Sequence, residues 1–154
     1  MTESKLKEML YLYPSIPQEI ILKNQEIADI IKLKVEYGAT MTPGGALGMP
    51  RSTTISDPTY KSVELLYEKY EKHIQRLIAE ISQMLDAKEQ IDKMLNWLRG
   101  QSMSARKLEY ELIVLKYFEK APNQTICNKL CYERTGLHRF HDRVMAQIIK
   151  WWNT

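Results

Sequence analysis

The fold is decided by residues 104–152, which read SARKLEYELIVLKYFEKAPNQTICNKLCYERTGLHRFHDRVMAQIIKWW. Within this stretch the helical repeat of apolar residues is interrupted twice, which indicates three consecutive helices. We predict these helices at residues 104–120, 123–130 and 134–152. The second and third are separated by residues 131–133, a connection of the length found in helix-turn-helix units.

Each of these three predicted helices has an apolar face. Because the apolar positions recur at helical spacing, we expect the three faces to share one core. They are Leu108, Leu112, Leu115 and Phe118 in the first helix, Ile126, Cys127 and Leu130 in the second, and Leu137, Phe140, Val144 and Ile148 in the third.

The remaining face of the third predicted helix is basic and rich in hydrogen-bonding groups. Residues 101–154 hold nine Lys and Arg against five Asp and Glu, whereas residues 1–100 hold 13 against 14. Such a face suits the major groove of DNA, because arginine pairs with guanine edges and with phosphates. The alternative is a solvated face that binds nothing. We predict base contacts from Arg134, Thr135, His138 and Arg139. We predict phosphate contacts from Arg143, Lys129 and Lys150. Asp142 should lie on the same face of the helix.

Upstream, residues 59–99 carry the strongest helical signal in the chain. Asp57 can cap this helix, Pro58 suits its first position, and no further Pro or Gly occurs before Gly100. A helix of about 40 residues spans ~60 Å, too long for one small domain to cover, so it should form a coiled coil. The partner is either the same helix of a second subunit or, antiparallel, residues 17–37, and a dimer could contain both pairings. The predicted oligomerisation seam comprises Val63, Tyr67, Tyr70, Ile74, Leu77, Ile81, Met84, Ile91, Leu95 and Leu98.

One position of this seam carries a charge. Lys88 falls where the heptad spacing requires an apolar residue. Either its stem packs in the seam while its amine reaches water, or it sets the register or the oligomeric state, as single polar seam residues can.

The N-terminal part predicts two further helices. The first contains Leu6 and should stop at Pro14, and the second should end at Gly38, a suitable C-terminal cap. Residues 38–58 hold four of the six glycines and predict a linker. We therefore expect four parts: N-terminal helices at 1–37, the linker, the long helix at 59–99 and the helix-turn-helix domain at 104–154. The apolar face of the second helix should contain Ile20, Ile27, Ile30, Ile31 and Val35.

Several functional classes find no support in the sequence. There is no apolar run of transmembrane length and no signal-peptide layout, so we predict a cytoplasmic protein without membrane contact. No nucleophile lies beside a base, no carboxylates are paired in an apolar setting, and Gly44 and Gly45 lack the other residues of a phosphate-binding loop. We therefore predict no enzymatic activity and no cofactor.

Cysteine and histidine allow one metal-site alternative. Cys127, Cys131, His138 and His141 could in principle ligate zinc, but the gap of six residues between the two pairs is short for common zinc fingers. The helix-turn-helix interpretation also turns Cys127 inward and His138 outward. We therefore predict no metal site and, because nothing in the chain suggests export, no disulfide.

Three segments of the C-terminal part carry a resemblance to a known family. The runs ELIVLKYFE from Glu111, ICNKL from Ile126 and HRFHDRVMA from His138 resemble the region of sigma factors that reads the −35 promoter element. Together with MPRSTTISDPT from Met49 and the heptad helix, they resemble phage and prophage transcriptional regulators of the ArpU and RinA type. This resemblance implies an all-helical DNA-binding protein that activates late phage genes near their promoters.

Two residues depart from the family's pattern. Cys131 occupies the turn position that usually holds glycine, so the turn is either strained or different in shape. Gly136 lies near the start of the recognition helix, where it costs about 1 kcal/mol relative to alanine. It either lets the backbone approach DNA or simply loosens that turn.

The sequence thus predicts an all-α regulator that binds double-stranded DNA as a homodimer, with RNA polymerase as a further candidate partner. Two alternatives from other classes stay open. One is a small terminase subunit for DNA packaging, although its DNA-binding unit generally comes first in the chain. The other is a module that binds RNA polymerase or a sigma factor without reading DNA.

Overall fold

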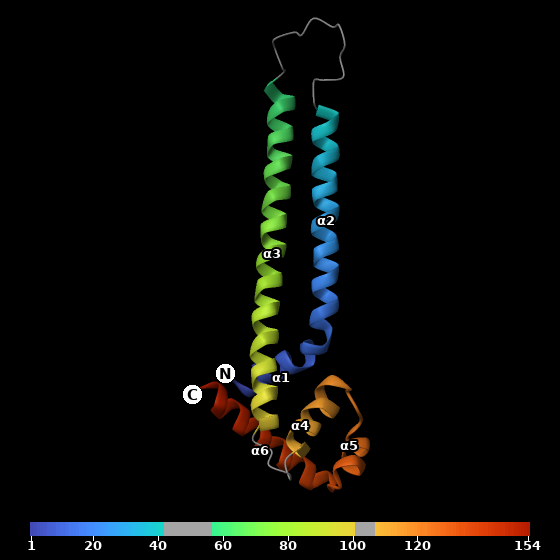
Figure 1. The fold of residues 1–154 in the computed structure, drawn as a ribbon, viewed down its shortest axis with the longest axis vertical. Coiled ribbons are helices and arrows are strands. Elements are labelled where there is room, and N and C mark those ends of the chain that lie inside the picture. The colour runs from blue at the N-terminus through green and yellow to red at the C-terminus, as the bar shows by residue number, and fades with distance from the viewer. Residues whose placement is uncertain (42–56, 101–106) are drawn as a thin grey trace, which may run out of the picture. The chain divides into compact units, whose positions relative to one another are not determined.

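The computed structural model describes residues 1–41, 57–100 and 107–154, and in these ranges all regular structure is helical, as the sequence predicts. None of the helices in these ranges is both long and apolar enough to cross a membrane. The elements, shown in Figure 1, are α1 (Glu3–Leu12), the 3-10 turn η1 (Tyr13–Ser15), α2 (Ile16–Met41), α3 (Asp57–Gly100), α4 (Lys107–Ile113), the π-helical turn η3 (Val114–Phe118), α5 (Asn123–Leu130) and α6 (Arg134–Trp152).

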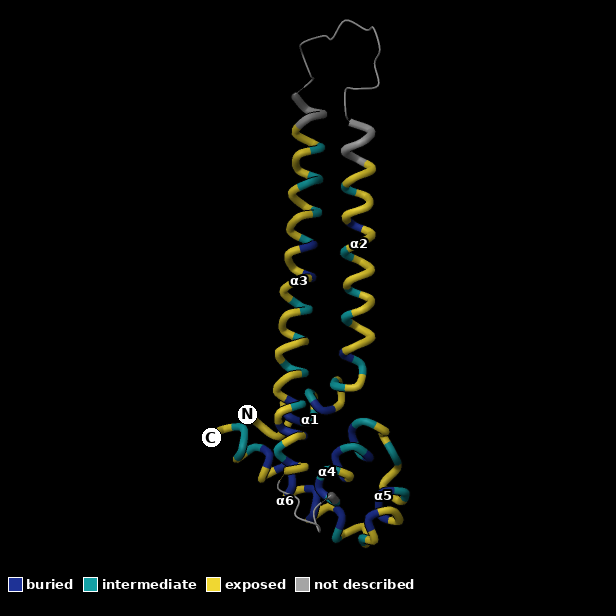
Figure 2. The backbone as a smooth tube through the Cα atoms, in the orientation of Figure 1, coloured by how far each residue is buried: buried dark blue, intermediate teal, exposed yellow. Residues whose placement is uncertain are grey.

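The chain divides into two compact units. Residues 18–83 form the hairpin unit, and residues 1–17 together with 84–154 form the terminal unit. Figure 2 shows that buried backbone segments gather in the terminal unit, whereas the hairpin unit has only short ones. The predicted domain at 104–154 therefore did not include two segments of the terminal unit, namely residues 1–17 and the last turns of α3.

In the hairpin unit, α2 and the first part of α3 lie side by side and run antiparallel (Figure 1). Ile30 of α2 is buried against Ile74 and Leu77 of α3, with Ile27 and Tyr70 packed beside them. Of the two pairings that the heptad pattern allows, the structure contains the antiparallel one within a single chain. The seam from Val63 to Ile81, predicted for oligomerisation, is thus half-buried or buried in this pairing.

Two lysines of α2 set the register of this pairing. The amine of Lys23 lies 2.6 Å from a carboxylate oxygen of Glu80, and the amine of Lys34 lies 2.9 Å from one of Glu71. The hydroxyl of Tyr67 donates to the carbonyl oxygen of Lys34 at 3.1 Å. Because a shift by one helical turn would separate both ion pairs, these contacts favour the observed register over its neighbours.

The predicted apolar face of α2 is wrong at two positions. Ile31 and Val35 are exposed at 46% and 65%, while Lys23 and Lys34 lie half-buried along α3. A long lysine stem can cover apolar surface and still bring its amine to a carboxylate at the rim. The seam of α2 therefore contains Lys23 and continues from Ile30 to Lys34, and Ile31 and Val35 each lie one residue outside it.

The predicted end of α2 is also wrong, because the helix continues through Gly38 to Met41. A glycine inside a helix costs about 1 kcal/mol relative to alanine but does not end the helix. Pro43, which cannot continue the hydrogen-bonded ladder, is the stronger stop signal. Of the predicted linker, residues 38–41 belong to α2 and residues 57 and 58 to α3, and the rest lies outside the described residues.

In the terminal unit, the last turns of α3 pack into a core with helices from both ends of the chain. Leu6 and Leu10 of α1 are fully buried there, as is Ile91 of α3. The indole rings of Trp97 in α3 and Trp151 in α6 stack with their centroids 5.5 Å apart. The seam positions from Ile91 to Leu98 are therefore covered within the chain. The fully buried core also contains Met94, Leu112, Ile113, Tyr117, Ile126 and Ile148.

Lys88, the charged seam position, belongs to a polar cluster in the terminal unit. Its amine donates to a carboxylate oxygen of Asp92 at 2.8 Å and lies 5.9 Å from the ring centroid of Tyr13. The Tyr13 hydroxyl donates to the other oxygen of Asp92. Burial and the Asp92 carboxylate raise the pKa of Tyr13 to about 12, so the hydroxyl keeps its proton. Lys88 thus helps to fasten η1 to α3.

The burial of α1 makes a prediction for stability. Replacing Leu10 with alanine should lower the free energy of unfolding by about 2 to 5 kcal/mol, because a fully buried leucine is truncated. Leu12, which is 51% exposed, provides the matched control, and its alanine variant should change stability by less than about 0.5 kcal/mol. Urea denaturation followed by circular dichroism measures both. Equal effects of the two variants would contradict the placement of α1 in the core.

Candidate nucleic-acid interface

The first predicted helix of the C-terminal part changes type and ends two residues earlier than expected, while its predicted start at residue 104 lies outside the described residues. It begins at Lys107 in the described residues and continues as the π-helical turn η3, which ends at Phe118. In this turn the amide of Glu119 donates to the carbonyl oxygen of Val114 at 2.8 Å, five residues earlier. The wider turn allows Leu115 and Tyr117 both to point into the core. The prediction of a single regular α-helix up to residue 120 was therefore wrong.

The turn between α5 and α6 is strained at Cys131, which is one of the two possibilities that the sequence left open. Cys131 adopts a left-handed conformation with φ 57° and ψ 40°, which for a residue with a Cβ costs of order 1 kcal/mol. The amide of Tyr132 donates to the carbonyl oxygen of Cys127 at 3.1 Å and closes the end of α5. Glu133 is extended, and its carbonyl oxygen accepts from the amide of Leu137 to begin α6.

The side chain of Tyr132 lies beside Gly136. The ring of Tyr132 stacks on that of Phe140, with centroids 4.9 Å apart and an angle of 9° between the planes. A Cβ at Gly136 would lie 3.4 Å from Cδ1 of Tyr132. The tyrosine ring therefore lies at contact distance from the first turn of α6. The distance is an ordinary van der Waals contact, so alanine also fits.

The predicted DNA-contacting residues of α6 all lie exposed on one side of the helix. The opposite side, with Leu137, Val144 and Ile148, is buried in the terminal unit. Gln147 is exposed four residues after Arg143 and extends the face, and the helical spacing alone would have included it. The exposed face comprises Arg134, Thr135, His138, Arg139, Asp142, Arg143, Ala146, Gln147 and Lys150.

Helix α5 adds a second, smaller polar surface. Lys129 is exposed, as predicted for a phosphate contact. The amide of Gln124 donates to the side-chain oxygen of Asn128 at 3.2 Å, and both residues are exposed. Neither amide side chain was among the sequence-predicted residues. Both can hydrogen-bond to phosphate oxygens, which is how the first helix of such a pair contacts DNA.

Two contacts restrain side chains of the exposed face of α6. The guanidinium of Arg143 lies 5.8 Å from the ring centroid of Phe140, a cation–π contact that leaves its N–H groups available to a phosphate. A carboxylate oxygen of Asp142 lies 3.4 Å from Nδ1 of the buried His141. Asp142 therefore connects the exposed face to the core.

Directly beneath this face lies a buried histidine–tyrosine pair. The hydroxyl of Tyr117 and Nε2 of His141 are 2.7 Å apart, and both side chains are almost completely buried. With the imidazole proton on Nδ1, Nε2 accepts from the Tyr117 hydroxyl and Nδ1 donates toward Asp142. Burial raises the pKa of Tyr117, while burial and the Lys116 charge lower the pKa of His141. Both groups are therefore neutral near pH 7.

The four residues of the zinc alternative point in different directions. Cys127 and His141 are buried, whereas Cys131 and His138 are exposed. His141 already uses both ring nitrogens in the contacts with Tyr117 and Asp142. In the part of the chain that the structure describes, no three His, Cys, Asp or Glu side chains are grouped to hold a metal ion.

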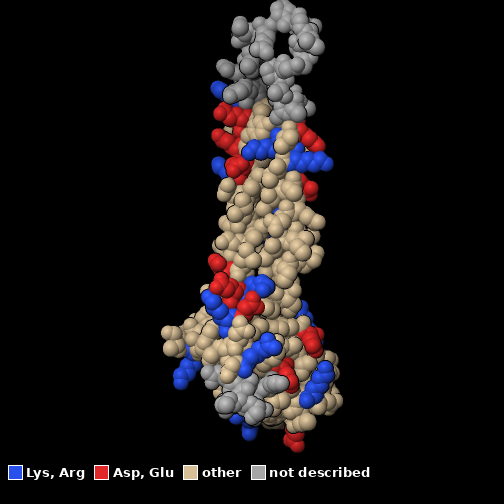
Figure 3. Space-filling view, in the orientation of Figure 1, with Lys and Arg blue, Asp and Glu red and all other residues tan. Residues whose placement is uncertain are grey.

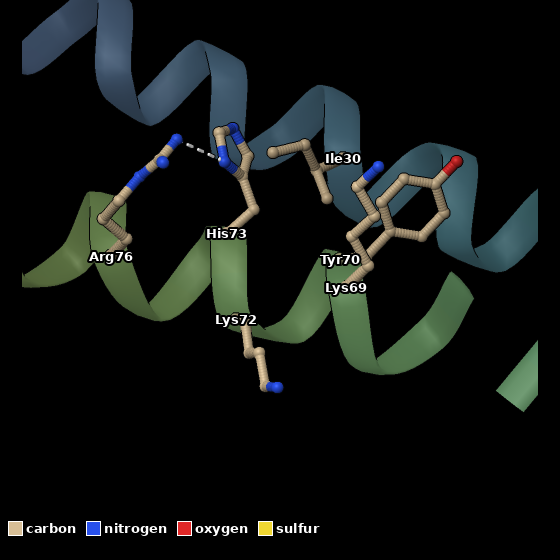
Figure 4. A pocket seen from close by; sticks show the side chains of 6 residues that line it. All are labelled: Ile30, Lys69, Tyr70, Lys72, His73 and Arg76. Atoms are coloured by element: carbon tan, nitrogen blue, oxygen red, sulfur yellow. Dashed lines mark hydrogen bonds between the residues drawn. The ribbon is translucent and has the colours of Figure 1, made fainter. Parts of the chain in front are cut away.

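A second basic surface lies on the hairpin unit. An open pocket of about 510 Å³ is lined by Ile30 and Tyr70 together with basic side chains of α3 (Figure 4). The imidazole of His73 accepts from Arg76 at 2.7 Å and lies 3.0 Å from Glu26, and Glu80 lies 3.9 Å from Arg76. These carboxylates offset the basic groups, so this pocket is a weaker anion site than the face of α6. The basic lining residues are Lys69, Lys72, His73 and Arg76.

The chain matches no protein-family model, no curated protein and no solved structure. The likeness to phage regulators therefore stays a prediction from sequence. The geometry of α5 and α6 indicates the interface, because α6 has one buried apolar side and one exposed basic side.

The buried His141 predicts a pH dependence of stability. In the unfolded chain a histidine titrates near pH 6.5, whereas burial and Lys116 lower the folded-state pKa. Below pH 6.5 the unfolded state thus binds more protons, so the stability is complete above that pH and is lost as the pH falls toward the folded-state pKa. Urea denaturation between pH 8 and pH 5 should show this loss, and His141→Gln should reduce it. The exposed His138 is the control: if His138→Gln flattened the profile equally, the assignment to His141 would be wrong.

At Gly136 we predict a substitution that stabilises the protein. Replacing it with alanine should raise the free energy of unfolding by up to about 1 kcal/mol, because alanine is the better helix former and its Cβ finds ordinary contact distance. Thermal unfolding measures the change. A loss of more than about 1 kcal/mol would mean that Tyr132 cannot tolerate the added methyl group.

Proposed function

We propose that the chain is a sequence-specific DNA-binding transcriptional regulator in which α6 is the recognition helix. The observation that carries this proposal is the division of α6 into two sides. One side is anchored in the core by Leu137, Val144 and Ile148, and the other presents arginines, a threonine and a histidine to solvent. A rigidly held helix with such a side is what the major groove accommodates.

In this proposal the two helices divide the contacts. The first turns of α6, with Arg134, His138 and Arg139, reach base edges, where an arginine can bind O6 and N7 of guanine with two hydrogen bonds. Lys129 on α5 and Lys150 at the end of α6 bind phosphates on either side. Asp142 excludes phosphate from the middle of the face, so its charge helps to orient the helix.

The biological role that we propose follows from the sequence resemblance. Sigma-like segments in the C-terminal part favour action at or near a promoter, and the likeness to ArpU- and RinA-type proteins favours activation of late phage genes in the cytoplasm of a bacterial host. Contact with RNA polymerase fits the same role. A homodimer would place two recognition helices on one DNA site and add their binding free energies.

Selection of duplex DNA from a pool with a random core tests sequence-specific binding. The full chain should enrich one motif, and Arg139→Ala should weaken binding to that motif by about 1 to 3 kcal/mol while changing binding to unrelated DNA little, as expected for a base contact. Fluorescence anisotropy at several salt concentrations measures both affinities. Lys129→Ala should weaken binding to all sequences. It should also reduce the slope of the logarithm of the binding constant against the logarithm of the salt concentration by about one.

The control is Lys93→Ala, which removes an exposed lysine of α3 whose amine lies 2.7 Å from a carboxylate oxygen of Glu89. It should leave both affinities unchanged. If no motif is enriched and Arg139→Ala and Lys93→Ala behave alike, the assignment of α6 as a recognition helix is wrong. Binding to RNA polymerase without DNA binding would instead support the alternative of a polymerase-interacting module.

A further inference from the structure

Tyr132, in the turn between α5 and α6, is restrained through both its side chain and its backbone. Its ring lies parallel to that of the buried Phe140, with the centroids 4.9 Å apart. Its atom Cδ1 would lie 3.4 Å from a Cβ at Gly136. The left-handed Cys131 directs the chain out of α5 immediately before it, and its amide donates to the carbonyl oxygen of Cys127. The ring is therefore fixed against the beginning of α6.

The hydroxyl of Tyr132 takes no part in holding the fold together. The residue is half-buried, yet its hydroxyl has no hydrogen-bond partner among the described residues. Every buried side-chain nitrogen or oxygen atom of these residues has a partner, so the unpaired hydroxyl reaches solvent. In contrast, the hydroxyl bonds another part of the fold in Tyr13, Tyr67 and Tyr117. Tyr132 thus combines a fixed ring with a free donor, an arrangement that suits a binding surface.

This hydroxyl belongs to one edge of the exposed face of α6. Residues 136, 140, 143 and 147 are separated by steps of three and four, so they follow one another along the same side of the helix. Tyr132 contacts the first two of them. The guanidinium of Arg143 lies 5.8 Å from the ring centroid of Phe140, and Gln147 is exposed one turn further on. Tyr132 and Arg143 therefore both rest on one buried phenylalanine ring.

The charges around Tyr132 favour an anion. Lys129 is exposed in the last turn of α5, three residues earlier, and Arg143 lies on the other helix. The turn also contains Glu133, but its backbone is extended, and consecutive side chains of an extended chain point to opposite sides. Figure 3 shows lysine and arginine side chains at several places on the terminal unit, in the lower part of the view. The distinguishing feature of this edge is thus the fixed neutral donor beside the cations.

We propose that Tyr132 binds the DNA backbone, with its hydroxyl donating to a phosphate oxygen next to the phosphate contact of Arg143. This inference rests on the proposed function and adds to it a residue that contributes affinity without charge and without reading sequence. Tyrosine is among the side chains that bind phosphate in protein–DNA complexes, and residues before a recognition helix contact the backbone. Because the ring is already restrained, little conformational freedom is lost when the hydroxyl binds.

The variant Tyr132→Phe tests this contact in the full chain, because it removes the hydroxyl and keeps the stacked ring. Fluorescence anisotropy should show affinity falling about five- to tenfold for the enriched motif and equally for unrelated duplex DNA. The slope of the logarithm of the binding constant against the logarithm of the salt concentration should not change, because a neutral hydroxyl releases no counterion. Arg143→Ala should reduce that slope by about one.

The matched control is Tyr110→Phe, which removes the hydroxyl of a half-buried tyrosine of α4 whose ring centroid lies 5.0 Å from the guanidinium of Arg99. It should leave both affinities unchanged. Thermal unfolding provides a second readout: Tyr132→Phe should unfold at the same temperature as the wild type, because the lost hydroxyl has no partner in the fold.

Three results would overturn the phosphate contact: unchanged affinity of Tyr132→Phe, a loss confined to the enriched motif, or a lower unfolding temperature of this variant. In each case Arg139→Ala would still report on base reading, so the proposed function would stand if that variant kept its effect. A wild-type chain that binds no duplex DNA would overturn both the proposed function and this contact.

Discussion

The structure depends on one shared apolar core, to which α1, the last turns of α3 and α6 all contribute. Leu6 and Leu10 enter this core from the beginning of the chain, Ile91 and Leu98 from the middle, and Ile148 from the end. Each of these side chains is buried almost completely, so α6 is held in place by segments far apart in sequence. The exposed face of α6 can therefore present its basic side chains in a constant arrangement, which recognition of base edges requires.

The long helix α3 serves two purposes along one seam. In the hairpin unit its seam is covered by α2, and in the terminal unit it contributes to the core with α1 and α6. A single heptad pattern thus meets two different partners, because the spacing of apolar residues is the same whatever covers them. Charged contacts then distinguish the two parts: Lys23 and Lys34 select the register of α2, while Lys88 and Asp92 hold Tyr13.

Two polar side chains lie in the core beneath the exposed face of α6. His141 and Tyr117 occupy core positions that apolar residues could fill, and they stay neutral because burial disfavours their charged forms. Through Asp142 the histidine is connected to the exposed face. The left-handed Cys131 adds strain at the turn before α6, and the stacked rings of Tyr132 and Phe140 hold that turn against the helix.

Helical periodicity in the sequence was enough to predict the long helices and the apolar sides of α5 and α6. The bounds of α5 and α6 agree with the predicted ones, and the predicted face of α6 is exposed, because the 3.6-residue repeat assigns each residue to a side. Only the tertiary structure decided what covers each apolar side. It placed α2 over the first part of the seam, added α1 to the terminal unit, introduced the π-helical turn that buries Tyr117, and moved Ile31 and Val35 outside the seam. The physical reason is that burial is a property of two surfaces, whereas a repeat in the sequence describes only one.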